Sequence, residues 1–300
     1  LILGKVKTPN LVPVPDVEVR LEPNLGRSLQ FNGTSDYVTF DTTAVLYLAA
    51  TYTLEGWFRA LPLSGDYSMI TITDVGESNT DIFTRIHLDD AGHLYYTHKG
   101  SSISTPDVYK DQEWHHFAAA HDSLEMFLYI DGNLIGSTTD TQFIDANTNL
   151  VFGRRTPDED LDYYAGYLDD FRVWSVARTR EDIRLNDERT MNGEEDFLSA
   201  YWKFDEVLGE KVFDLTASDI DGFICDVERS EFKAPIWVSG LTDENGDYSI
   251  KGIYYGSGTT FDVIPVKETP IGRSLNFDGT DDFLQFNFKR LDFTLGYTVE

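Results

Sequence analysis

The sequence has one cysteine, few basic residues and no long apolar run. Cys225 stands alone among 300 residues, so no disulfide can form within the chain. Because a secreted eukaryotic domain of this size often carries disulfides, this favours a bacterial or archaeal surface protein. No apolar segment approaches the roughly 20 residues of a membrane-spanning helix, so we expect no direct membrane insertion in this window.

Basic residues are outnumbered by acidic ones. The chain has 24 Lys and Arg against 52 Asp and Glu, a formal net charge of −28. Such a surface repels the phosphate backbone, so we predict no nucleic-acid partner, and docking on anionic membranes is disfavoured. The acidity fits a soluble extracellular module that binds calcium. The alternative is that it serves solubility alone.

What the sequence does have is aromatic residues, 14% of the total, mostly Phe and Tyr. Together with Val, Ile and Thr they favour β-strands. Short alternating runs separated by turn residues predict an all-β, two-sheet sandwich, and Asp131-Gly132 predicts a tight hairpin. The predicted strands cover residues 29–31, 37–40, 53–58, 68–72, 83–88, 93–97, 115–120, 125–130, 134–136, 150–153, 164–168, 171–174 and 198–204.

One helix is predicted, over residues 175–183. Thr179 is its expected N-cap, and Asp182, three residues later, completes a variant capping box. Ile183 and Leu185 are expected to pack the helix on the sandwich.

A long repeat marks the domain organisation. Residues 26–40 return as residues 272–286 with nine of fifteen positions identical, 246 residues further on. One large unit therefore ends and a second begins near the end of the sequence. We expect the chain to be a window of a longer, repetitive protein.

An ordered series of motifs carries a resemblance over roughly residues 26–237. The series consists of Gly26-Arg-Ser-Leu-Gln-Phe-Asn-Gly-Thr-Ser-Asp-Tyr-Val38, Tyr52-Thr-Leu-Glu-Gly-Trp-Phe-Arg59, Glu113-Trp-His-His-Phe-Ala118, Met126-Phe-Leu-Tyr-Ile-Asp-Gly132, Gly166-Tyr-Leu-Asp-Asp-Phe-Arg-Val-Trp174, Val176-Ala-Arg-Thr-Arg-Glu-Asp-Ile183 and Ala200-Tyr-Trp-Lys-Phe204. It resembles the laminin G-like, concanavalin A-like jelly roll of bacterial surface proteins. The resemblance implies a jelly-roll sandwich.

The flanks resemble a carboxypeptidase-regulatory-like, Ig-type β-domain. Residues 1–24 look like its first half and residues 238–270 like its second, and neither half buries enough apolar surface to fold alone. We therefore predict that the jelly roll, residues 25–237, is inserted into the small domain. Residues 271–300 would begin a second jelly roll in tandem. The alternative is a linear string in which residues 1–24 belong to a preceding domain.

The pattern for catalysis is missing. Glycoside hydrolysis needs two carboxylates at a set separation, and no Glu-x-Asp-x-x-Glu strand pattern is present. His87, His93 and His98 do not show metal-ligand spacing such as H-E-x-x-H, and His115 and His116 lie in a core strand motif. Trp57, Trp114, Trp174 and Trp202 all lie in strand motifs and are expected in the core. We predict that the chain is not an enzyme.

A calcium site is the metal site that the resemblance implies. In the families that this chain resembles, a cation ties the first-strand turn to a late strand. The matching positions are Asn32 and Asp36 in the turn, and Asp169 and Asp170 on the late strand. Their oxygens are of the kind that calcium prefers. The alternative is that Asp36 caps the turn and Asp170 accepts a hydrogen bond from Arg172 or from a backbone amide.

Ligand-binding candidates lie in loops. One long loop contains Asp74, Glu77, Asn79 and Asp81. Tyr163 and Tyr164 are adjacent, so one of the two side chains is expected to point outward, where its ring could stack on a sugar.

The predicted function is a non-enzymatic repeat module of a large extracellular or cell-surface protein, bacterial in origin, serving adhesion or as a stalk. The alternative is a calcium-dependent, carbohydrate-binding domain like a lectin, and a glycoside hydrolase is a remote third reading. Predicted partners are glycans, other surface proteins and neighbouring repeats of the same chain.

Overall fold

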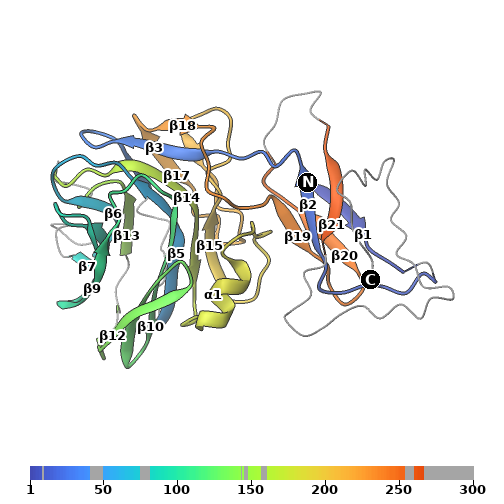
Figure 1. The fold of residues 1–300 in the computed structure, drawn as a ribbon, viewed down its shortest axis with the longest axis horizontal. Helices are drawn as coiled ribbons and strands as arrows, with labels where there is room; N and C mark the ends of the chain where they lie inside the picture. The colour runs from blue at the N-terminus through green and yellow to red at the C-terminus, as the bar shows by residue number, and fades with distance from the viewer. Residues whose placement is uncertain are drawn as a thin grey trace. The chain divides into compact units, whose positions relative to one another are not determined.

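The computed structural model describes residues 1–8, 10–40, 50–74, 82–142, 144, 148–156, 161–253 and 260–266. They divide into two compact units (Figure 1). The larger is built from Gly26–Ile236. The smaller combines Leu1–Leu25 with Trp237–Lys251 and residues 260–266.

The larger unit is a sandwich of two antiparallel sheets, as predicted (Figure 1). The first sheet contains, in spatial order, β12 (Asn133–Thr139), β11 (Glu125–Ile130), β10 (His115–Asp122), β5 (Thr51–Ala60), β14 (Ala165–Trp174), β3 (Ser28–Asn32) and β18 (Glu228–Ser230), with β15 (Leu198–Trp202) paired to β14. The second contains β16 (Lys211–Val212), β17 (Gly222–Cys225), β4 (Tyr37–Phe40), β13 (Thr148–Phe152), β6 (Tyr67–Asp74), β7 (Ile82–Leu88), β8 (His93–His98) and β9 (Ser101–Val108).

The core lies between these sheets and is rich in aromatic rings. Phe152 of β13 has its ring centroid 4.8 Å from that of Phe171 in β14 and 5.7 Å from that of Trp202 in β15. Phe40 and Phe204 complete the group around it, at 5.3 and 5.9 Å. The side chains that alternation directs inward from both sheets therefore meet in one cluster.

Two local predictions are confirmed in detail. Asp131 and Gly132 join β11 to β12 with φ of 48° and 67°, the left-handed pair that a tight hairpin requires. The helix α1 (Arg180–Asn186) begins after the N-cap Thr179, which forms the capping box with Asp182. Ile183 on this helix is fully buried.

The structure also differs from the sequence predictions. Leu185 is 66% exposed, and Ile183 is the residue that the short helix buries. Trp114 is only partly buried, since it lies at a strand end. The strands predicted over 164–168 and 171–174 form one strand, β14, whose register shifts between Asp169 and Arg172. The edge strand β9 was not predicted, because its sequence is mostly polar and contains Pro106.

The smaller unit pairs the start of the chain with residues after 237. The strand β1 (Ile2–Lys5) pairs with β20 (Asp247–Ile250), and β2 (Glu18–Glu22) lies between β19 (Ser239–Leu241) and β21 (Asp262–Val266). The two segments that form this unit therefore lie on either side of the larger unit in the sequence. Its Ig-type character stays a prediction, and the predicted second jelly roll at residues 271–300 lies outside the described residues.

Candidate functional site

A groove of about 650 Å³ lies in the larger unit. This volume is in the range of small-ligand sites. Three chain segments line it: the β3–β4 turn, the segment before β6 and the segment before β14. The lining residues are Gly33, Thr34, Ser35, Ser64, Gly65, Asp66, Tyr67, Leu161, Asp162 and Tyr163. Hydroxyls, carboxylates and an aromatic ring therefore share one surface.

The β3–β4 turn is shaped by its own side chains. Asn32 Oδ1 accepts hydrogen bonds from the backbone N–H groups of Thr34 at 2.7 Å and Ser35 at 3.0 Å. Asp36 Oδ2 accepts from the backbone N–H of Asn32 at 2.8 Å. Gly33 has φ of +79°, where a side chain is strained. These contacts fix the positions of the Thr34 and Ser35 hydroxyls in the groove wall.

The segment before β6 is held by Lys110. Its Nζ donates to the carbonyl oxygens of Gly65 at 2.6 Å and Leu63 at 3.2 Å, and it lies 4.0 Å from the centre of the Tyr67 ring. The Gly65 N–H donates to Asp90 Oδ1 at 2.6 Å. These contacts hold the backbone of residues 63–65 in place. The exposed residue Asp66, which follows them, therefore lines the groove from a fixed backbone.

The segment before β14 is fixed by Arg85. Its guanidinium donates to Asp162 Oδ2 at 2.8 Å and to Ser68 Oγ at 2.7 Å, and the Ser68 N–H donates to the Asp162 carbonyl at 2.9 Å. Tyr163 is half-buried and lines the groove. Tyr164 was predicted as a ligand contact and that is wrong, because its side chain is fully buried and its hydroxyl donates to the backbone. One member of the pair points outward, as expected.

The predicted binding loop after β6 is only partly described. Asp74 is the last residue of β6, and its backbone pairs with Thr148 of β13. The other predicted residues of that loop, Glu77, Asn79 and Asp81, lie outside the described residues.

The four residues predicted to bind calcium do not lie together. Asn32 pairs with Ala165 of β14, whereas Asp169 is four residues further along that strand, about 13 Å at ~3.3 Å per residue. Burial raises the pKa of Asp36, and its acidic neighbours Asp226 and Glu228 add to this rise, while hydrogen bonds from Asn32 and Ser35 oppose it. This set therefore does not fit one cation, and calcium stays a prediction for the chain.

Asp169 and Asp170 lie instead in buried ion networks. The carboxylate of Asp170 contacts Arg172, as the alternative prediction stated, and accepts a hydrogen bond from the Tyr201 hydroxyl. Burial raises its pKa although Arg172 opposes this. Asp169 accepts from the Ala234 N–H at 2.8 Å, and burial, with Asp205 and Asp170, raises its pKa well above the ordinary value.

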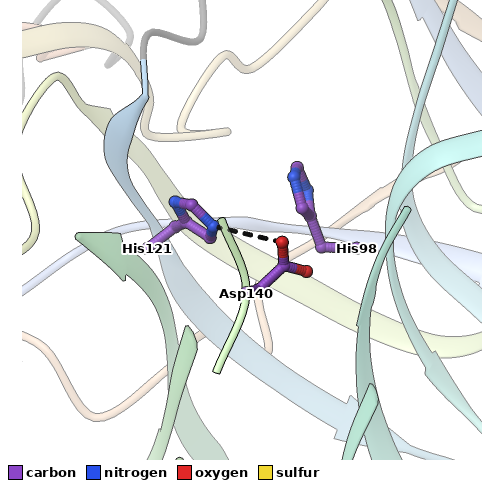
Figure 2. A group of neighbouring side chains, drawn as sticks. All are labelled: His98, His121 and Asp140. Atoms are coloured by element: carbon purple, nitrogen blue, oxygen red, sulfur yellow. Dashed lines mark ion pairs between the residues drawn. The ribbon is translucent and has the colours of Figure 1, made fainter. Parts of the chain in front are cut away.

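A second group of potential ligands was missed by the sequence analysis. His98, His121 and Asp140 place one ligand atom each within 4.8 Å of one another (Figure 2). Within the described ranges it is the only group of three or more His, Cys, Asp or Glu side chains that meets this distance. The three residues come from different strands or strand ends and share no short motif, so no local pattern could reveal them.

His116 is a buried imidazole that makes stability depend on pH. Its side chain is 1% exposed, and neither ring nitrogen has a hydrogen-bond partner among the residues described. Burial lowers its pKa to about 4; Glu55 and Asp131 oppose this shift, and Arg172 and Arg178 add to it. On acidification from about pH 6.5 the unfolded chain takes up this proton before the native chain does, so stability falls with pH.

We expect His116 to lower the free energy of unfolding by about 2–3 kcal/mol between pH 7 and pH 4. His116→Phe retains a ring against Trp57, whose centroid is 5.5 Å away, but cannot titrate. Its stability should therefore fall less over this range. Urea unfolding of both proteins at several pH values, followed by tryptophan fluorescence, measures the difference, and parallel pH curves would contradict the prediction.

The comparisons with known proteins place the larger unit in a family. A sequence model of the concanavalin A-like lectin/glucanase superfamily matches residues 32–184, which is 153 of the 300 residues. The chain belongs to this superfamily. The laminin G-like part of the resemblance and the predicted jelly-roll class are thereby confirmed. None of the curated protein sequences compared with the chain matches it.

Several solved structures are similar to the chain at low sequence identity. A candidate carbohydrate-binding protein from Bacteroides ovatus is 18% identical with a TM-score of 0.56; the match covers 71% of this chain and 62% of that one. The chain thus spans less than two thirds of that protein. The CBM40 module of a Ruminococcus gnavus sialidase, solved with α2,3-sialyllactose, is 11% identical with a TM-score of 0.45, covering 53% and 95%.

A third similar structure is domain 4 of an extracellular arabinanase, AbnA, from Geobacillus stearothermophilus in complex with arabinotriose. It is 18% identical with a TM-score of 0.41, and the match covers 61% of this chain and 85% of that one.

In the part of the chain that the structure describes, no helix has the length and apolar character of a membrane span.

Proposed function

We propose that the larger unit is a non-enzymatic glycan-binding module and that the groove beside Tyr163 is its binding site. The observation that carries this proposal is the composition of the groove. The half-exposed side chain of Tyr163 lies beside hydroxyl and carboxylate groups, and hydrogen bonds hold the backbone of the segments that carry them. A sugar offers an apolar ring face and a rim of hydroxyls, which such a surface complements.

The carboxylates of the groove suit recognition better than hydrolysis. Two acidic residues, Asp66 and Asp162, are among the described residues that line it. Glycoside hydrolysis needs one carboxylic acid and one carboxylate that both face the scissile bond. Asp162 is ion-paired with Arg85 at 2.8 Å, so it serves the structure of the wall. Asp66 is left as an acceptor for sugar hydroxyls.

Membership of a lectin-containing superfamily and the fold shared with a candidate carbohydrate-binding protein support this assignment. We propose an extracellular or cell-surface setting, with the module repeated along a longer adhesive or stalk-forming chain. A pure spacer needs no ligand site, so the groove favours adhesion through glycans over a purely structural role.

A glycan array tests the proposal. The chain, freed of any affinity tag, should bind a restricted set of glycans, and Tyr163→Ala should lose most of that signal. Tyr95→Ala is the matched control, because Tyr95 is also half-buried but lies on β8, outside the groove. An array on which the wild-type chain binds nothing would favour the spacer role.

A further inference from the structure

His98, His121 and Asp140 bring three potential metal ligands to one buried point between the two sheets. His98 is the last residue of β8 in the second sheet, whereas His121 lies in β10 of the first sheet and Asp140 directly follows β12. Their exposed fractions are 0%, 0% and 3%. Figure 2 shows the His121 ring directed at the Asp140 carboxylate, with His98 beside it.

Two atoms of these side chains have no hydrogen-bond partner among the described residues: Nε2 of His121 and Oδ2 of Asp140. The distance from His121 Nε2 to Asp140 Oδ1 is 3.9 Å, too long for a hydrogen bond. Burying a carboxylate and a ring nitrogen without partners costs several kcal/mol, unless a further group interacts with both atoms.

The other atoms of these side chains are held by neighbours. His121 Nδ1 lies 2.8 Å from the Ala50 carbonyl oxygen and 3.2 Å from the Ser123 N–H, and the tautomer that donates to Ala50 has a lone pair on Nε2 for a metal. Asp140 Oδ1 accepts from the Gln142 N–H at 2.7 Å. His98 Nδ1 lies 2.9 Å from Thr84 Oγ1 and 3.0 Å from the Tyr52 hydroxyl, and its Nε2 lies 3.2 Å from the Gln142 carbonyl oxygen, a contact that a metal bound at Nε2 would replace. Hydrogen bonds of this kind orient the ligands of metal sites.

We propose that His98, His121 and Asp140 bind a divalent transition metal, with Zn²⁺ the best match, and that the metal ties the two sheets together. Two imidazoles and one carboxylate suit zinc, whereas calcium prefers oxygen ligands alone. A tetrahedral zinc separates its ligand atoms by roughly 3.4 Å. Small side-chain rotations would close the present separations, all within 4.8 Å.

The burial of all three side chains indicates a structural metal. A catalytic zinc keeps one position open to substrate, whereas a structural zinc is enclosed. The metal would bind only the folded chain, so it should stabilise the larger unit by mass action.

The test uses the full chain without an affinity tag, stripped of metal by a chelator. Titration with Zn²⁺ should show one ion bound per chain and a rise in melting temperature. Co²⁺ in the same site, with a water as fourth ligand beside the three side chains, should give the visible absorption of a four-coordinate ion. Asp140→Asn keeps an acceptor for the Gln142 N–H but removes the charge, and it should weaken Zn²⁺ binding at least about 100-fold.

His93→Asn is the matched control, because the His93 side chain is 34% exposed and pairs with Asp89 away from the cluster. It should bind Zn²⁺ as the wild type does. Failure of the wild-type chain to bind Zn²⁺ would overturn the proposal and leave the cluster a buried ion pair. Equal affinity in Asp140→Asn would overturn it too. Should that variant not fold, X-ray absorption of the wild-type zinc complex decides, since a spectrum without two imidazole ligands contradicts the proposed site.

Discussion

Replacing Arg172 with methionine should lower the free energy of unfolding of the larger unit by about 3–5 kcal/mol, because it leaves buried carboxylates without their partner. Arg172 is 1% exposed and contacts Asp170, Glu55 at 3.4 Å and the Asn186 carbonyl at 2.8 Å. Methionine fills a similar volume, so the loss reports the charge and the hydrogen bonds rather than a cavity.

The cost should fall mainly on Asp170. Glu55 keeps Arg178 at 2.6 Å and the Trp174 indole N–H at 2.9 Å, whereas Asp170 keeps the Tyr201 hydroxyl. The variant should therefore recover part of the loss in acid, where the carboxyl of Asp170 takes up a proton. Urea unfolding measures both effects.

Arg184→Met is the control for this substitution. Arg184 lies on the exposed face of α1, so its replacement should change stability by less than about 1 kcal/mol. Similar losses in the two variants would show that the buried ion network around β14 does not hold the sandwich together.

Replacing Phe152 with alanine should cost about 3–5 kcal/mol. Its ring lies between the sheets and contacts Phe171 and Trp202 of the opposite sheet, so truncation leaves a cavity that neither sheet can close alone. Phe197→Ala is the matched control, because that side chain is 63% exposed. Thermal or urea unfolding compares the two. A loss at Phe152 no larger than that at Phe197 would mean that the core lies elsewhere.

The sequence predicted those features of the fold that depend on residues close together in the chain, namely turns, the helix start and most strands. Asp131-Gly132 determines a hairpin, and Thr179 with Asp182 determines a helix start, because turn geometry and capping are local. Alternation of apolar residues predicted most strands for the same reason. It missed β9, whose polar edge position needs little apolar surface.

The sites could not be predicted in this way, because register and bulges decide which residues meet. Asp169 and Asp170 belong to β14 as expected, but the pairing of Ala165 with Asn32 leaves them too far along the strand to share an ion with the turn. His98 and His121 are brought together by sheets that face each other, and no spacing in the sequence records that contact. Of the residues predicted to bind ligand, Tyr163 lines the groove.

The most direct test of the proposed glycan site is isothermal titration of the best-binding array glycan into the wild-type chain, Tyr163→Ala and Tyr95→Ala. Loss of the stacking face should weaken binding by Tyr163→Ala roughly 10-fold or more, about 1.4 kcal/mol, while Tyr95→Ala binds as the wild type does. Unchanged affinity in Tyr163→Ala would show that the glycan binds outside this groove.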